Sequence, residues 1–158
     1  MSANLAFELG SSAAVLGWLS LILGTIASIK PIGQWALCLG GRIIPLLLAL
    51  LYLYLVIAFW GSAPNGNFSS LEGVNQLFTS PGNLAAGWIH FLAFDLFIGR
   101  WIIDDSIQER KQQGKQGRKG LWQLILCLPL TFMYGPTGLL LYYLFKYLSR
   151  SRKQRNLK

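Results

Sequence analysis

The chain has 158 residues, of which 53% are hydrophobic and only 13% are charged, whereas about 25% of the residues of a soluble domain are charged. With a mean hydropathy of +0.45 spread over several long apolar runs, this composition argues against a water-soluble fold and against a soluble domain with a single membrane anchor. The net charge of +8 lies in the connections and the tail, where a bilayer surface explains it better than nucleic acid does. We therefore predict a small polytopic membrane protein with no nucleic-acid partner.

The first apolar segment, residues 5–29, is predicted to be a transmembrane helix of the mature protein. No Lys or Arg precedes it, so we expect neither a secretory signal nor a transit peptide. Lys30 and Pro31 are expected to end the helix, because proline lacks a backbone donor and disfavours helical geometry in the residue before it. The segment contains small residues that let helices pack closely in lipid: Ala13, Ala14, Gly17, Gly24 and Ala27.

The second apolar segment, residues 43–60, would span about 27 Å as a helix, which is just enough to cross a membrane. Arg42 precedes it, so the connection before it is basic. Pro45 lies in its first turn, where the missing N–H costs little. The following loop, residues 61–83, is rich in turn-forming residues and contains no Lys or Arg.

The third apolar segment, residues 84–103, is predicted to cross the membrane although three ionisable side chains interrupt it. The polar run at 108–120 is expected to be a solvated basic loop. The last apolar segment, residues 121–148, would form a helix of about 42 Å, too long for a straight crossing of a hydrocarbon core of about 30 Å. Pro129 and the Gly-Pro pair at 135–136 interrupt it, and a membrane tolerates such breaks only where protein or water satisfies the freed backbone groups.

These segments predict an all-α polytopic membrane protein. We expect a single domain over residues 1–158, a four-transmembrane-helix bundle whose last helix is broken by proline and glycine, and a basic tail at 149–158. The basic residues lie in the first and third connections and the tail, so the positive-inside rule places the N-terminus outside. Four simple crossings, our prediction, would put the tail outside as well, against that rule. The alternative is a last segment that enters the membrane and returns at 135–136, which would leave every basic residue on one side.

The ionisable side chains of the third segment are the main functional candidates. A charge at the centre of a bilayer costs about 2.5 to 3.5 kcal/mol, so Asp95 is expected to face protein or water. A step of five residues turns a helical side chain by about 140°, and His90, Asp95 and Arg100 therefore do not form one stripe. Joint chemistry would need groups from other helices, and the candidates are Tyr52, Tyr54, Thr131 and Tyr134.

Structural roles are also open for these side chains. His90 can donate to a backbone carbonyl, Asp95 can accept from a tyrosine hydroxyl, and Arg100 can snorkel to the interface. The single histidine argues against the multi-histidine iron centre of a membrane hydroxylase, and we expect no metal site. The glycines of the basic loop lack the spacing of a nucleotide-binding fingerprint.

Aromatic side chains accompany both polar groups. His90 is predicted to share its face with Phe94, whereas Asp95 shares its face with Trp88 and Phe91. Aromatic side chains around a few polar groups can hold a long apolar ligand with polar ends, and plain helix packing explains them equally well. The candidate ligand-binding residues are Trp88, Phe91, Phe94, Arg100 and Tyr134.

Three stretches of the chain carry a family resemblance. They are GWIHFLAFDLFIGRWIIDDS at 87–106, LEGVNQLF at 71–78 and LPLTFMYGPTGLLLYYL at 128–144. The chain resembles, over about residues 18–148, the neoxanthin-synthase-like membrane proteins, known from plants as the abscisic-acid-deficient type four family and also found in cyanobacteria. The resemblance implies a four-helix integral membrane protein of carotenoid and xanthophyll metabolism. In plants the associated conversion is the isomerisation of violaxanthin to neoxanthin.

That isomerisation opens a 5,6-epoxide and forms an allene by loss of a proton, so it needs an acid and a base and no cofactor. The resemblance makes His90 the catalytic acid/base and Asp95 its complement or electrostatic partner. The chain starts close to its first membrane helix, so we expect a cyanobacterial member in the thylakoid or plasma membrane, acting on violaxanthin or on another carotenoid. The alternative function is a non-catalytic carotenoid-binding or assembly subunit of a pigment–protein complex. Membrane lipids are expected partners in either case.

Overall fold

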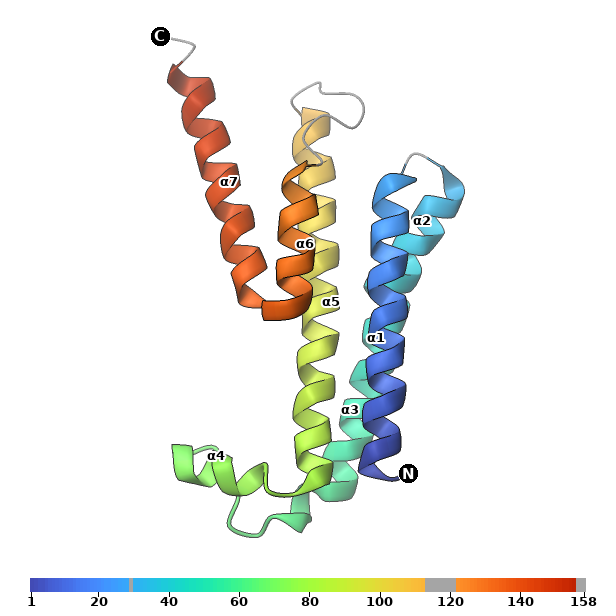
Figure 1. Cartoon of the computed structure of the whole chain (residues 1–158), viewed down its shortest axis with the longest axis vertical. Helices are drawn as coiled ribbons and strands as arrows, with labels where there is room; N and C mark the ends of the chain where they lie inside the picture. The colour runs from blue at the N-terminus through green and yellow to red at the C-terminus, as the bar shows by residue number, and fades with distance from the viewer. Residues whose placement is uncertain (29, 113–121, 156–158) are drawn as a thin grey trace. The chain divides into compact units, whose positions relative to one another are not determined.

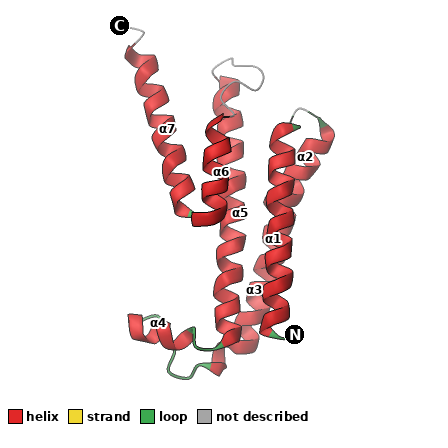
Figure 2. Ribbon diagram, in the orientation of Figure 1, coloured by secondary structure: helices red, strands yellow, loops and turns green. Residues whose placement is uncertain are grey.

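The computed structural model describes residues 1–28, 30–112 and 122–155, and the regular elements within these ranges are all helices (Figure 2). The all-α prediction is therefore confirmed. The chain forms two compact units, Met1–Phe97 and Ile98–Lys158, and the boundary between them falls inside helix α5.

Helix α1, Ala3–Ile26, follows the first predicted segment closely (Figure 1). Ser2 caps its start, because its Oγ accepts from the backbone N–H of Leu5 at 3.3 Å. The buried face of α1 carries several small residues, as predicted, and they allow close approach of its neighbours. A Cβ added at Gly17 would lie 2.9 Å from the side chain of Leu96 on α5.

Residues 31–42, before the second predicted segment, are helical, which corrects the expected connection. Helix α2, Pro31–Cys38, continues through a π-helical turn, η1, Leu39–Ile43, into helix α3, Ile44–Phe59, and the short 3₁₀ turn η2, Trp60–Ser62. Together they form one apolar stretch of 32 residues.

The π-helical turn explains why glycine and proline do not break this long helix. Pro45 lacks the N–H that would bond the carbonyl of Gly41, and a wider turn before a proline accommodates that loss. Gly40 lies so close to α1 that an added Cβ would collide with the backbone oxygen of Gly17. Glycine is therefore needed at this contact rather than at a bend.

The predicted loop at 61–83 contains a short helix, α4, Leu71–Leu77. The Oγ of Ser70 accepts from the backbone N–H of Gly73 at 3.0 Å and caps this helix. Ser62 and Ser80 join the two ends of the loop through a hydrogen bond of 2.5 Å between their hydroxyls. The loop is thus closed onto the start of α5.

Helix α5, Pro81–Gln112, is longer than the predicted segment at both ends. Its polar C-terminal turns stay helical because their side chains find partners one turn away. Arg100 Nε pairs with Asp104 at 2.7 Å, and Arg110 Nε donates to the backbone oxygen of Ser106 at 3.2 Å. The basic loop expected at 108–120 therefore begins later, and residues 113–121 lie outside the described part of the chain.

The last apolar segment forms two helices, α6, Trp122–Tyr134, and α7, Pro136–Arg155 (Figure 1). They are antiparallel neighbours, because Gln123 near the start of α6 donates to the hydroxyl of Ser149 near the end of α7, at 3.5 Å. Gly135 joins them with a φ of 45°, a left-handed conformation that glycine adopts without strain. The predicted break is confirmed.

This hairpin corrects the single crossing that we predicted for residues 121–148. The chain runs along α6 and turns back along α7, in agreement with the alternative in which the segment turns back at 135–136. On the side of α5 that belongs to this unit, Asp105 Oδ2 accepts from the hydroxyl of Tyr142 at 2.6 Å and from Lys146 of α7. These contacts tie α7 to the last turns of α5.

Three helical stretches of the described chain are long and apolar enough to span a membrane: Ala3–Ile26, Pro31–Ser62 and Pro81–Lys111. A fourth crossing is not confirmed, since α6 has 13 residues and spans only about 20 Å. Large apolar side chains lie on the outside of the stretches, and Ile57, for example, is 75% exposed. A surface of this kind suits a lipid environment.

Candidate functional site

Helix α5 presents His90 and Asp95 on different faces, as the helical period predicts. His90 lies on an exposed face of the first unit, whereas Asp95 is only 3% exposed. No hydrogen bond or ion pair of the described residues joins these two side chains. The structure therefore does not bring them together as a bonded acid–base pair.

A pocket of about 280 Å³ opens beside His90. Its walls come from α3, from the segment around α4 and from the first turns of α5. The lining side chains that matter for chemistry are Tyr52, Trp60, Phe68, Phe78, Asn83 and His90. Aromatic rings thus form most of the named walls, and only three polar groups reach the space between them.

Two glycines of α5 bring the loop and its rings close to the helix. An added Cβ at Gly82 would collide with the ring of Phe59, and one at Gly87 would lie 2.7 Å from the ring of Phe78. A larger residue at Gly87 would push the Phe78 wall of the pocket outward, whereas one at Gly82 would displace Phe59 of α3, which does not line the pocket. The local sequence therefore builds a narrow pocket at the start of α5.

His90 lies between two aromatic rings from different helices. Its ring centroid is 5.3 Å from that of Tyr52 on α3 and 4.7 Å from that of Phe94 one turn along α5. The shared face of His90 and Phe94 is confirmed. Of the candidate partners on other helices, Tyr52 contacts His90, whereas Tyr54 accepts a hydrogen bond from the N-terminal amine at 3.0 Å.

Asn83 is a member of the pocket that the sequence analysis missed. It lies seven residues before His90, which is about two helical turns or 10.5 Å along the axis and returns to nearly the same face. Its side chain is 5% exposed, and its Nδ2 has no hydrogen-bond acceptor in the described structure. A polar amide two turns from His90 is the signal that could have identified it.

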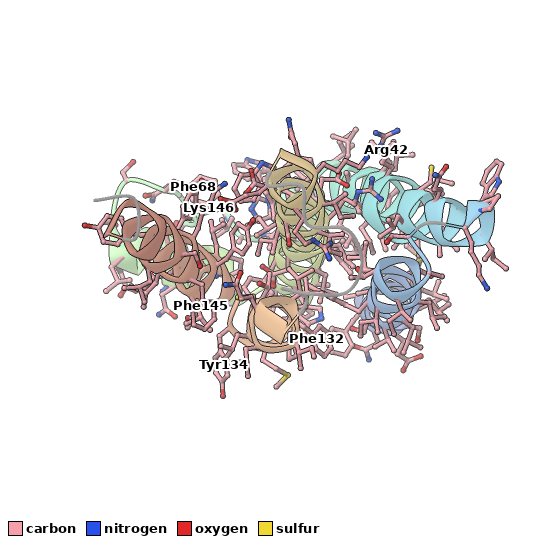
Figure 3. The ribbon with its side chains drawn as sticks, turned by 90° about the horizontal axis from the view of Figure 1, so that it is seen from above. Arg42, Phe68, Phe132, Tyr134, Phe145 and Lys146 are labelled. Carbon is pink, nitrogen blue, oxygen red and sulfur yellow. The ribbon has the colours of Figure 1, made fainter. Side chains whose placement is uncertain are left out.

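A second, larger cavity of about 450 Å³ continues along the same two helices. It is lined by η1 and α3 from Gly41 to Ala49 and by Ala93, Phe94 and Phe97 of α5. Since Phe94 also contacts His90, the two cavities follow one another along α3 and α5. Arg42 is the charged lining residue, and its side chain extends outward from the helix (Figure 3).

Trp88 and Phe91 form a different aromatic group. Their rings stack with centroids 6.0 Å apart, and Trp88 also contacts Phe7 at 5.8 Å. Trp88 Nε1 donates to the hydroxyl of Ser11 on α1 at 3.1 Å. These two candidate ligand residues therefore hold α1 against α5 and do not line the His90 pocket.

The remaining predicted ligand residues belong to the second unit. Arg100 is engaged by Asp104, as described above, and Tyr134 is 63% exposed at the end of α6, where its ring extends outward (Figure 3). The Oγ1 of Thr131, another candidate partner, donates to the backbone oxygen of Cys127 at 2.8 Å. The side chains that line the His90 pocket all belong to the first unit.

The pocket contains groups that can bind an apolar ring and transfer one proton. Aromatic walls favour flat or alicyclic apolar groups, and a histidine can accept or donate a proton near neutral pH. The Tyr52 hydroxyl and the Asn83 amide add hydrogen-bond donors. This set suits acid–base chemistry on a mostly apolar molecule.

Comparison with known proteins identifies the family of the chain. The sequence profile described as ABA DEFICIENT 4-like matches residues 5–142. The chain belongs to the ABA DEFICIENT 4-like family. This family member is 27% identical over 115 residues to Protein ABA DEFICIENT 4, chloroplastic, of Arabidopsis thaliana, an alignment that covers 68% of this chain and 50% of the plant protein.

The family expected from the sequence is therefore confirmed, and this member of the ABA DEFICIENT 4-like family spans about half the length of its plant relative. No solved structure matches the chain.

Proposed function

We propose that this family member binds a carotenoid beside His90 and isomerises an epoxy-carotenoid, in the manner of the conversion of violaxanthin to neoxanthin. The observation that carries the proposal is the contact between the rings of a histidine and a tyrosine beside an aromatic pocket of a member of this family. We further propose that it acts in a thylakoid or plasma membrane.

The proposed reaction needs one proton added and one removed. Protonation of the epoxide oxygen breaks its bond to one ring carbon and leaves a hydroxyl. Loss of the hydrogen on the neighbouring chain carbon supplies the electron pair of the new cumulated double bond. Substrate and product are isomers, so the reaction consumes no oxidant or cofactor.

His90 and Tyr52 can close this proton cycle. The neutral imidazole of His90 accepts the proton from the chain carbon, while the hydroxyl of Tyr52 protonates the epoxide oxygen. His90 then returns its proton to Tyr52, and the contact of their rings, 5.3 Å between centroids, supports this step. The aromatic walls limit access of water, which would otherwise open the epoxide to a diol.

Asp95 keeps a less direct role in this proposal. Its carboxyl group is buried and lies outside the set of residues that line the pocket. As an electrostatic partner it would act through the buried charge and not through a hydrogen bond to His90. We therefore propose Asp95 as a positioning residue.

A non-catalytic carotenoid-binding or assembly subunit of a pigment–protein complex is the second candidate. The cavity that continues past Phe94 favours it, because its wall is apolar apart from Arg42 and offers no acid–base pair. Such a protein would hold pigment in stoichiometric amount without converting it.

Pigment analysis of a bacterium engineered to make violaxanthin tests both candidates. Cells that express the wild-type chain are expected to form neoxanthin, and cells that express His90→Ala are expected to accumulate violaxanthin while the variant still inserts in the membrane. Tyr147→Phe, at an exposed position of the second unit, is the control. Pigment that co-purifies unconverted with the wild type would favour the second candidate, and a colourless preparation without product would refute both.

A further inference from the structure

We infer that Asn83 binds an oxygen atom on the terminal ring of the ligand and so selects hydroxylated carotenoids over purely hydrocarbon ones. The inference rests on the proposed function, because it takes the ligand to be a carotenoid. It assigns to Asn83 a positioning role for which the first turns of α5 provide the geometry.

The state of the Asn83 side chain is the first observation. Its amide is 5% exposed and lines the pocket, and its Nδ2 finds no acceptor among the described residues. A buried amide donor without an acceptor destabilises a fold, so most buried polar groups are paired. A ligand oxygen in the pocket would supply the missing acceptor.

The polar groups around Asn83 are already engaged with each other. The hydroxyl of Ser80 is bonded to that of Ser62 at 2.5 Å, and the backbone oxygen of Ser80 accepts from Leu84 at 2.9 Å. The loop end beside Asn83 therefore has its own hydrogen bonds. The amide is left for a molecule that enters the pocket.

The shape of the pocket indicates which part of the ligand lies beside Asn83. The space of about 280 Å³ is bounded by the rings of Trp60, Phe68 and Phe78, and this suits a compact six-membered ring. The longer cavity beyond Phe94 suits the extended hydrocarbon chain. The ring would thus lie near the start of α5, with the chain running along α3 and α5.

The spacing along α5 separates Asn83, which would bind the ring hydroxyl, from His90, which would react with the ligand. Asn83 and His90 lie on nearly one face about 10.5 Å apart along the axis, so their side chains reach different ends of one ring. A ring hydroxyl bound by Asn83 would leave the epoxide and the adjoining chain carbon nearer to His90. The hydroxyl would therefore fix the register of the substrate without taking part in the reaction.

Binding of two pigments to the purified full chain in detergent tests this inference. Zeaxanthin carries a hydroxyl on each ring, and β-carotene has the same carbon skeleton without oxygen. Titrations followed by quenching of tryptophan fluorescence are expected to show about tenfold tighter binding of zeaxanthin by the wild type. Asn83→Leu is expected to remove this preference, because zeaxanthin binding should weaken about tenfold relative to β-carotene binding.

Two further measurements separate selection from a structural role. Asn83→Leu replaces an unpaired buried amide with an apolar group of similar size, so its melting temperature is expected to equal or exceed that of the wild type. Asn75→Leu, at an exposed position of α4, is the matched control and should keep the preference. A lower melting temperature of Asn83→Leu with equal weakening of both pigments would overturn the inference.

The outcomes for the wild type distinguish this inference from the proposed function. Equal affinity for the two pigments would overturn the role of Asn83 and leave carotenoid binding intact. Absence of binding of either pigment would refute the proposed function and the inference with it.

Discussion

The rings of His90 and Tyr52 lie 5.3 Å apart between centroids and are inclined by 57°, although they come from different helices, α5 and α3. Both line the same pocket. The imidazole of His90 on α5 thus contacts the phenol ring of Tyr52 on α3. This contact gives the pocket an imidazole and a phenol that come from two different helices.

Removal of the Tyr52 hydroxyl should separate binding from conversion. Tyr52→Phe keeps the ring that contacts His90, so pigment affinity is expected to stay unchanged. Product formation should fall about a hundredfold, because a general acid contributes a factor of that order. Both quantities can be measured on purified protein in lipid nanodiscs, by pigment titration and by chromatography of the products.

The control for this substitution is Tyr147→Phe, which removes an equivalent hydroxyl from an exposed position. It should match the wild type in both measurements. Full product formation by Tyr52→Phe would exclude the phenol as the acid.

Asp95 offers a test of a buried carboxyl group whose Oδ2 has no hydrogen-bond partner in the described structure. Asp95→Asn keeps the shape of the side chain and removes the charge. We expect an unchanged melting temperature, because no ion pair is broken, and a loss of product formation smaller than that of His90→Ala. A loss as large as that of His90→Ala would place Asp95 directly in the proton cycle.

Much of the fold could be predicted because apolar runs in a membrane protein must form helices that satisfy their own backbone groups. The second and third runs lie within helices, and the first lies within α1 up to Ile26. The predicted ends of the helices were wrong where polar residues continue a helix. The ion pair of Arg100 with Asp104 stabilises the polar turns after residue 103. Gly40 lies in the π-helical turn, packed against α1, and does not end the helix.

The site was predictable only where local geometry decides it. The helical period correctly separated Asp95 from His90 and grouped His90 with Phe94. The period of one helix contains no information on which neighbouring helix packs against it, so Tyr52 stayed one candidate among four. Asn83 was not predicted because the sequence assigned it to the loop at 61–83, whereas α5 already begins at Pro81.

Close packing of α1 against η1 gives a stability prediction. Gly40→Ala would place a Cβ against the backbone oxygen of Gly17, which cannot move as a flexible side chain does. We expect a loss of about 1 to 3 kcal/mol in the free energy of unfolding, measured in detergent by chemical denaturation. Gly61→Ala is the matched control, because no atom lies within 4 Å of its added Cβ, and it should unfold like the wild type.

The helical hairpin of α6 and α7 gives the sharpest test of the topology. The side chains of Gln123 and Ser149 are hydrogen-bonded at 3.5 Å although 26 positions separate them in the chain. In one straight helix the same positions would lie about 39 Å apart. Cysteines placed at both positions, in a chain with Cys38→Ala and Cys127→Ala, are therefore expected to form a disulfide in membranes under mild oxidation.

Mass spectrometry of the linked peptides detects this bond. The control pair, Gln123→Cys with Thr137→Cys, places the second cysteine beside the turn at Gly135, about 17 Å from position 123 along the hairpin, and should stay reduced. A link in the first pair and none in the second would show that the tail returns to the side on which α6 begins. Failure of the first pair to link, in protein that still binds pigment, would restore the single crossing and place the basic tail on the opposite side.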